Sequence, residues 1–121
     1  MNTVSKISFA LVMIALFSFT NISKDQFFKI NLKITVLDEL GNIQEGASVK
    51  LFLNEEDYQK EKNAISKAQF TDEKGVVVYK ELESREYYIL VEKDDLNNNG
   101  GAVKTDKLQE KKVNKINIII D

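Results

Sequence analysis

Apolar and polar residues alternate along residues 28–37 of this chain, with the period of two that is typical of a β-strand. The apolar positions that share one face are Phe28, Ile30, Leu32, Ile34 and Val36. Lys and other polar residues occupy the positions between them. Because one face is apolar and the other polar, the pattern predicts a half-buried strand in an antiparallel sheet.

Residues 47–53 continue the alternation after a turn around Gly41 and a restart at Gly46. The pattern predicts a second strand whose inward side chains are Ala47, Val49, Leu51 and Leu53. It leaves Phe52 on the outer face.

Residues 70–91 carry the clearest strand, turn and strand pattern, and the other predicted strands are arranged around them. Asp72 and Gly75 predict a tight turn, because Asp stabilises bends and Gly accepts a positive φ. On the two strands that follow, five side chains are predicted to face the core: Val77, Tyr79, Tyr87, Ile89 and Val91. Leu82 is expected to cap the corner between them.

Residues 54–66 and 115–121 carry two further patterns. Residues 54–66 are polar and charged, and predict a solvated connection that crosses from one sheet to the other. The alternative is a binding loop that presents Tyr58. Glu56 and Lys60 could pair at helical spacing, although so short a helix has little stability alone.

Residues 115–121 predict a closing strand with Ile116, Ile118 and Ile120 inward, and Ile119 outward.

Residues 1–23 have the pattern of a signal peptide. Lys6 supplies a positive N-terminal region, and residues 7–19 form an uncharged apolar run, which is shorter than the roughly 20 residues of a membrane-spanning helix. The alternative is a buried helix of the mature domain. We expect cleavage near residue 23 and one mature domain over residues 24–121. No Cys follows to carry a lipid, so no stable membrane anchor is expected after cleavage.

Composition narrows the classes of function. The chain has 121 residues, 43% of them hydrophobic, and a formal net charge of −2, so it lacks the basic footprint that nucleic acids require. It contains no His, Cys, Trp or Pro. These absences exclude a Ser-His-Asp or Cys-His nucleophile, zinc sites built from His or thiolate, and disulfides.

Two runs of the sequence are similar to those of a known family: VLDELGNIQEGASVKLF and TDEKGVVVYKELESREYYILVEK. They resemble the carboxypeptidase regulatory-like domains, which belong to the transthyretin-like (prealbumin-like) group common in exported bacterial proteins. The matched positions are Val36, Asp38, Gly41, Gly46, Ala47, Val49, Thr71, Asp72, Gly75, Leu82, Tyr87, Ile89 and Val91. The resemblance implies an all-β, antiparallel Greek-key β-sandwich of six to seven strands. Such domains carry no peptidase residues, so it implies no catalytic role.

Residues 94–106 contain a candidate calcium loop. Asp95, Asn97 and Asn99 are followed by Gly100, and Asp106 stands at the twelfth position. This matches the oxygen-ligand spacing of a calcium loop, except that the last ligand is Asp rather than Glu. A plain sheet-edge loop gives the same Asn-Gly-rich pattern, so both readings stay open.

The sequence favours an exported, non-enzymatic module that acts through an unknown protein or glycan partner, in the bacterial periplasm or outside the cell. The alternative is a carbohydrate- or calcium-binding module that uses residues 94–106 and the aromatic residues Phe52, Tyr58 and Tyr88. A hydrolase would need facing carboxylates with a raised pKa on one of them. Glu55 with Asp57, and Asp94 with Asp95, are adjacent pairs in solvated runs, which rarely supply either.

Overall fold

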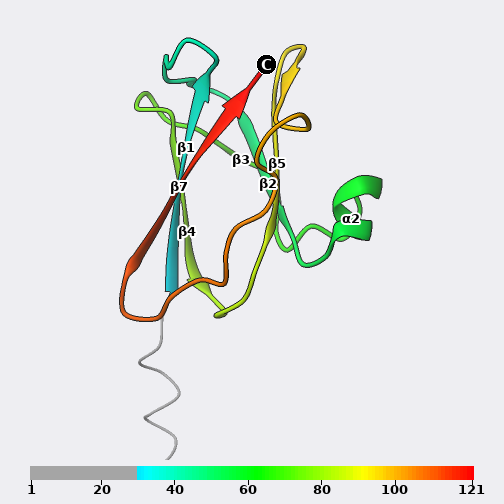
Figure 1. Cartoon of the computed structure of the whole chain (residues 1–121), viewed down its shortest axis with the longest axis vertical. Coiled ribbons are helices and arrows are strands. Elements are labelled where there is room, and N and C mark those ends of the chain that lie inside the picture. Colours follow the sequence, from blue (N-terminus) through cyan, green and yellow to red (C-terminus); the bar gives the residue numbers. More distant parts are fainter. Residues whose placement is uncertain (1–29) are drawn as a thin grey trace, which may run out of the picture.

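A computed structural model of the chain describes residues 30–121, which form two β-sheets packed face to face with one short helix on the outside (Figure 1). The expected leader over residues 1–23 and the inward position of Phe28 lie outside the described residues. Within residues 30–121, no helix has the length and hydrophobicity needed to cross a membrane.

The first sheet has three strands in the order β4-β1-β7, namely Val76–Leu82, Ile30–Asp38 and Val113–Ile120. The second has four strands in the order β3-β2-β5-β6, namely Gln69–Phe70, Ser48–Phe52, Tyr88–Lys93 and Leu96–Asn97. The helix α2 spans Glu55–Lys60. This confirms the predicted β-sandwich.

One pairing differs from the antiparallel sheet that we expected. β1 pairs antiparallel with β4, but it pairs parallel with β7, from Asn31 opposite Val113 to Asp38 opposite Ile120. A parallel pair cannot be closed by a hairpin and needs a long connection between its strands. β1 and β7 are the first and last strands of the described chain, so this condition is met.

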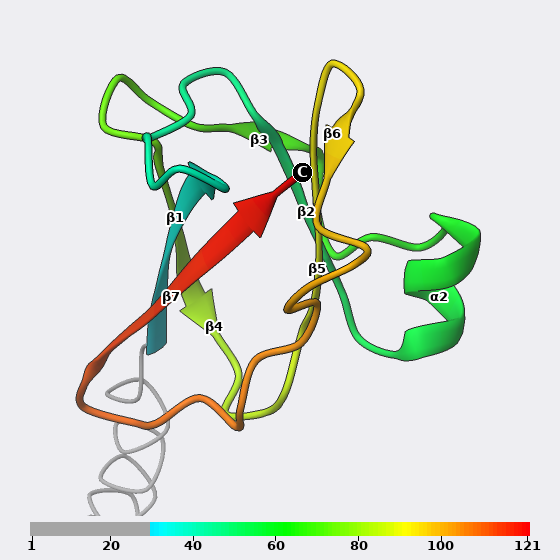
Figure 2. The same cartoon turned by 45° about the horizontal axis from the view of Figure 1, so that its top comes forward.

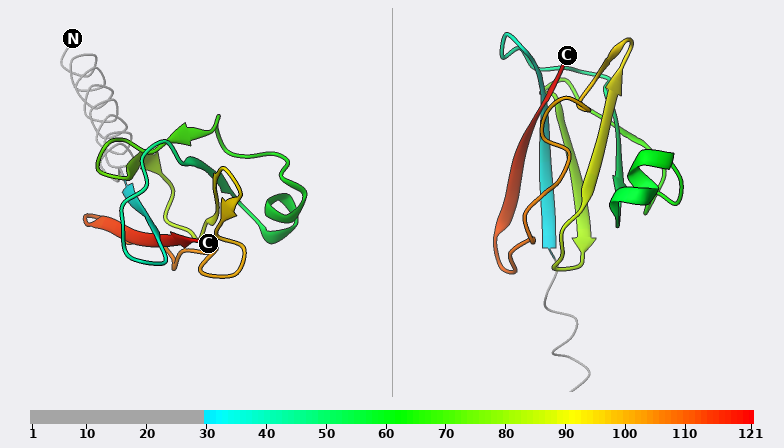
Figure 3. Two further views of the ribbon diagram at one scale, coloured as in Figure 1. Left: turned by 90° about the horizontal axis from the view of Figure 1, so that it is seen from above. Right: turned by 45° about the vertical axis from the view of Figure 1, so that its right-hand side comes forward.

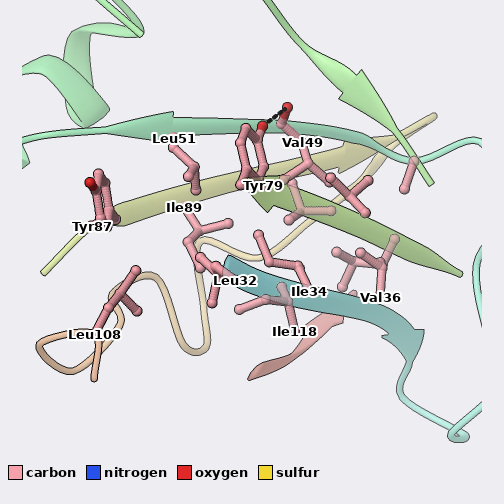
Figure 4. Packing of buried hydrophobic residues seen from close by; sticks show 14 of the residues in the cluster. Leu32, Ile34, Val36, Val49, Leu51, Tyr79, Tyr87, Ile89, Leu108 and Ile118 are labelled. Atoms are coloured by element: carbon pink, nitrogen blue, oxygen red, sulfur yellow. Dashed lines mark hydrogen bonds between the residues drawn. The ribbon is translucent and has the colours of Figure 1, made fainter. Parts of the chain in front are cut away.

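The core fills the space between the two sheets (Figure 4). It includes Val77 and Tyr79 of β4, Ile89 and Val91 of β5, and Tyr87 just before β5, which are the five residues predicted to face the core, together with inward residues of β1 and β7. Each such side chain contributes roughly 1.5–3 kcal/mol of transfer free energy. Tyr79 donates its buried hydroxyl to the Val49 carbonyl at 3.0 Å. Leu108 also belongs to the core, although its charged surroundings in the sequence gave no sign of this.

The end of β2 departs from the predicted alternation. Leu53 was expected inward but is 39% exposed, whereas Phe52, expected on the open outer face, has an exposed fraction of 0%. β2 ends at Phe52, and α2 then covers the outer face on which Phe52 lies (Figure 3). The predicted crossing by residues 54–66 is also wrong, because β2 and β3 are neighbours in one sheet.

The predicted turns form at the end of the sandwich that contains the last residues of β1, the hairpin between β5 and β6, and the C-terminus. Asp72 accepts backbone hydrogen bonds from Lys74 and Val76 at 2.9 and 3.0 Å. Gly75 has a φ of 74°, and a Cβ there would lie 3.0 Å from the Val36 carbonyl, so both conformation and space require glycine. Beside these turns, Asp121 and Asn97 exchange backbone hydrogen bonds, so the C-terminus joins β7 to β6 across the two sheets (Figure 2).

Candidate functional site

The short helix α2 begins at a well-formed N-terminal cap. The Asn54 side chain accepts a hydrogen bond from the Asp57 backbone N–H at 2.8 Å, and donates one to the Asp57 carboxylate at 3.1 Å. Acidic residues fill the first turn, where the helix dipole favours negative charge. The pairing of Glu56 with Lys60 that the sequence allowed is present at 2.8 Å.

Three aromatic rings from separate segments come together beneath α2. Tyr58 of the helix meets Phe52 edge-on, with ring centroids 6.1 Å apart, and lies tilted against Tyr88 at 6.0 Å. Lys104 places its ammonium 5.7 Å from the centre of the Tyr88 ring. These aromatic residues therefore form a second, smaller hydrophobic cluster on the outer face of the four-stranded sheet.

A pocket of about 410 Å³ opens beside this cluster, and we call it the α2 pocket. Leu90 and Val103 supply apolar surface. The polar lining contains three carboxylates and no Lys or Arg among the described residues: Glu55, Tyr58, Gln59, Glu61, Glu92 and Asn99. Burial, and then the charges of Glu61 and Glu92, raise the pKa of the Tyr58 hydroxyl. The pocket is therefore electrically negative.

The loop after β6 closes one side of this site through consecutive asparagines. Asn98 is fully buried; its amide accepts from the Val91 N–H at 2.9 Å and donates to the carbonyls of Ile89 and Ala102 at 2.8 and 3.0 Å. Asn99 accepts the Tyr58 hydroxyl at 2.7 Å, which ties the loop to α2. The sequence gave no reason to separate Asn98 from its neighbours.

The four residues proposed as calcium ligands follow β5 in the sequence and lie near its two opposite ends. Asp95 lies in the hairpin turn between β5 and β6, and Asn97 and Asn99 follow it. Asp106 directly follows Thr105, whose backbone N–H donates a hydrogen bond to the Tyr87 carbonyl. Tyr87 directly precedes β5, so Asp106 lies near the start of that strand, whereas Asp95 lies just beyond its end. Tyr87 and Lys93 are six positions apart along extended chain, which is about 20 Å at 3.3 Å per residue. The structure therefore keeps Asp106 apart from Asp95.

The side-chain oxygens of the two central candidates already accept hydrogen bonds within the protein. Asn97 accepts from the Asn99 backbone N–H at 2.9 Å, and Asn99 accepts from Tyr58. Among residues 30–121, no group of three or more His, Cys, Asp or Glu residues is arranged to hold a metal ion. Calcium binding stays a prediction, and in this conformation Asp106 could not share a site with Asp95.

The carboxylate pairs considered for hydrolysis have structural partners or lie in a turn. The Asp57 carboxylate accepts hydrogen bonds from the side-chain amides of Asn54 and Asn63 at 3.1 and 3.3 Å, and the Glu55 carboxylate accepts one from Gln59 at 3.3 Å. Asp94 and Asp95 form the exposed two-residue turn of the β5–β6 hairpin, where Asp94 has a φ of 53°.

Sequence reasoning named Phe52, Tyr58 and Tyr88 together as exposed aromatic residues; the structure brings the three rings into contact, but it buries Phe52. The missed signal is local: Asn54 is followed three positions later by Asp57, which is the spacing of a capped helix start. A helix begun at that point folds back over the last outward residue of β2. Recognition of this cap would have predicted the helix, whereas its packing over Phe52 depends on the tertiary structure.

Comparison with known proteins shows the fold alone. No protein-family model matches the chain, and no curated protein matches it. The fold is similar to that of BcpA, the major pilin subunit of Bacillus cereus, with a TM-score of 0.50 and 18% identity over 78% of this chain and 30% of that one. A second crystal structure, of a variant of the same pilin, gives 0.50 and 18% over 76% and 28%. The chain thus spans under a third of that protein, and what they share is a β-sandwich.

Proposed function

We propose that this chain is an exported, non-enzymatic β-sandwich module that acts by binding or structural interaction in the bacterial periplasm or at the cell exterior. The transthyretin-like character expected from its sequence, and its relation to carboxypeptidase regulatory-like domains, are parts of this proposal. The observation that carries it is the filled core: hydrophobic side chains occupy the space between the sheets. Recognition is therefore assigned to the outer faces.

Two further facts support a role in contact rather than catalysis. The chain has no His and no Cys, so the commonest acid–base and nucleophilic side chains are missing from the whole sequence. The structural similarity to a pilin subunit, a protein that is part of an assembly, agrees with such a role. A hydrolytic activity that copurified with the chain and was lost in Glu55→Gln would overturn it.

The location is tested by fractionating the native host and weighing the recovered chain. We expect the protein outside the cytoplasm, shortened by about 18–24 N-terminal residues, because Lys6 and the apolar run over residues 7–19 have the pattern of a cleaved leader. A full-length chain recovered from the cytosol would contradict export. Intact mass distinguishes the two results without a label.

A carbohydrate-binding role is the second candidate, because the α2 pocket places Tyr58 and the Asn99 amide beside carboxylates that could accept hydroxyl hydrogen bonds, and the Tyr88 ring lies against Tyr58. A glycan array tests it. If the candidate is right, a glycan bound by the parent chain should lose most of its signal in Tyr88→Ala and keep it in Phe70→Ala, which alters an aromatic residue that is 66% exposed on β3. Equal binding by both variants would contradict a site at the pocket.

A further inference from the structure

The outer face of the three-stranded sheet is basic and apolar. Its alternating outward positions carry three lysines, Lys33 on β1, Lys80 on β4 and Lys115 on β7. Lys33 lies directly opposite Val78 on one side and Lys115 on the other, so two ammonium groups and an apolar side chain share one row across the sheet. β4 also carries one carboxylate, Glu81, at the register shift between β1 and β4.

This face has exposed apolar surface between its lysines. Val78, Val113 and Ile119 are 42%, 61% and 51% exposed. The three lysines form no ion pair with any of residues 30–121. Apolar patches beside uncompensated charges of one sign are typical of interaction surfaces rather than of inert ones.

The opposite side of the molecule has the complementary character. There, α2 lies on the outer face of the four-stranded sheet, and the α2 pocket presents Glu55, Glu61 and Glu92 around the apolar residues Leu90 and Val103. Figure 3 shows α2 and β7 on opposite sides of the sandwich. The two surfaces of one chain therefore cannot meet each other, but those of two chains can.

We propose that a second copy of this chain docks its α2 pocket on the outer face of the β4-β1-β7 sheet. Lys33 and Lys115 of one copy then lie close to the carboxylates of the α2 pocket of the other, which are Glu55, Glu61 and Glu92. This names the partner within the proposed binding role and rests on that role. The Lys ammonium groups meet the carboxylates, and their methylene stems lie along Leu90 and Val103.

The contact is heterologous, because it joins two different surfaces of identical chains. Since those surfaces lie on opposite sides of the sandwich, each added copy leaves one of each free, and association continues as a linear row rather than closing as a dimer. Three strands about 25 Å long and 4.8 Å apart offer roughly 400 Å² per partner, half the usual 800 Å². Association is therefore weak and depends on charge.

Sedimentation velocity over a concentration series tests this on the chain as recovered from its host. The average mass should rise with concentration in about 10 mM salt and return to the monomer value in about 300 mM salt, because screening shortens the reach of the charges. Lys33→Gln/Lys115→Gln and Glu61→Gln/Glu92→Gln should each stay monomeric. The control Lys67→Gln/Lys74→Gln, which removes two exposed charges elsewhere, should associate like the parent.

Mixing the two neutralised variants gives the sharper result. One keeps its pocket and the other its lysine face, so an equimolar mixture has one complementary contact and should stop at a 1:1 dimer. A parent chain that stays monomeric in low salt, or a mixture that stays monomeric while the control associates, would overturn the proposal. Melting curves on each variant separate lost contact from lost folding.

Single cysteines give an independent measurement, because the chain has none of its own. Under mild oxidation, Lys33→Cys mixed with Glu61→Cys should form the mixed disulfide at least tenfold faster than either homodimer. Equal rates would mean random collision and would reject the contact. Neither experiment depends on cellular location, so their failure leaves export untouched, and cytosolic recovery of the chain leaves the contact untouched.

Discussion

Buried polar side chains in the described part of the chain replace backbone partners where the strands end or break. Thr71 accepts the Ala47 N–H at 2.9 Å, and Thr105 accepts the Tyr87 N–H at 3.0 Å. Asn98 satisfies three backbone groups beside β5. Each side chain stands where the regular ladder supplies no partner, which is the condition under which a buried polar group stabilises a fold.

Replacing Asn98 with Ala should therefore lower the free energy of unfolding by about 2–4 kcal/mol. It leaves the Val91 N–H and the Ile89 carbonyl without this partner, at about 1–3 kcal/mol for each group left unsatisfied. Asn97→Ala, which loses one exposed hydrogen bond, should cost under about 1 kcal/mol. Urea unfolding measures both; equal costs would mean that solvent replaces the Asn98 contacts.

The register of β4 is tested by a pair of neighbouring substitutions. Val77 is 4% exposed in the core and Val78 is 42% exposed on the outer face. Val77→Asp should cost about 3 kcal/mol or more by burying an unpaired carboxylate, and Val78→Asp much less. Chemical denaturation measures the difference, and a reversed order would place β4 one residue out of register.

The hydroxyl of Tyr79 makes stability fall in strong alkali. Burial raises the pKa of Tyr79 from its usual value near 10 to about 12. Between these two values the unfolded chain loses the proton first, so it binds fewer protons than the native state and stability falls as pH rises. Below about pH 10 this residue contributes no pH dependence.

Urea titrations at several values between pH 9 and pH 12 measure this effect. In Tyr79→Phe the baseline stability drops, because the bond to the Val49 carbonyl is lost, but the alkaline decline should become shallower. An unchanged slope would assign the decline to other tyrosines.

Among the elements, α2 shows how a local signal changes what a strand exposes. The helix has six residues, too few for stability alone, and persists because it is capped at Asn54 and packed through Tyr58 on Phe52. In return it removes Phe52 from solvent and supplies one wall of the α2 pocket.

Asn54→Ala should lower the free energy of unfolding by about 1 kcal/mol, the usual cost of removing an N-cap. It should also weaken the tyrosine signal in near-ultraviolet circular dichroism, because Tyr58 loses its fixed contacts with Phe52 and Tyr88. Lys60→Ala, at an exposed position of the same helix outside the lining of the α2 pocket, is the matched control; it should cost under about 0.5 kcal/mol and leave the tyrosine signal within error. A full tyrosine signal in Asn54→Ala would mean that packing alone holds the helix.

At the scale of the whole molecule, the length of the sandwich separates groups that are close in sequence. Residues 103–105 run back along β5, so Asp106 is carried to the end opposite Asp95. The spacing in the sequence could not reveal this separation. Twelve consecutive positions can surround one ion only if the loop curls around it, and the sequence does not show whether it does.

Melting curves in calcium test the consequence. A site with a dissociation constant of about 10⁻³ M would add roughly 1.4 kcal/mol at about 10 mM calcium. Any such shift, measured against magnesium at equal ionic strength, should be lost in Asp95→Ala and kept in Asp106→Ala. A shift that requires Asp106 would show that the loop rearranges around the metal, as the sequence spacing predicts.

The sequence by itself determined the strands β1, β4, β5 and β7, the core-facing side of each, and the predicted turns. Alternation on β1, β4 and β5 is a local property, because each side chain points opposite to its neighbour whatever the strand pairs with. The turns at Asp72 and Gly75 are equally local. The resemblance of these runs to a sandwich family agreed with the fold for the same reason.

Only the tertiary structure decided the parallel pairing of β1 with β7, the burial of Phe52 and the composition of the α2 pocket. Each depends on which segments meet across tens of residues, and a pattern with period two gives the face of a strand but not its neighbour. The assembly of Tyr58, Tyr88 and Asn99 beside Glu92 requires three segments, α2, β5 and the loop after β6, to converge on one sheet face. The burial of Phe52 and the negative charge of the α2 pocket arise only when these segments pack together, so the sequence alone could not predict the pocket.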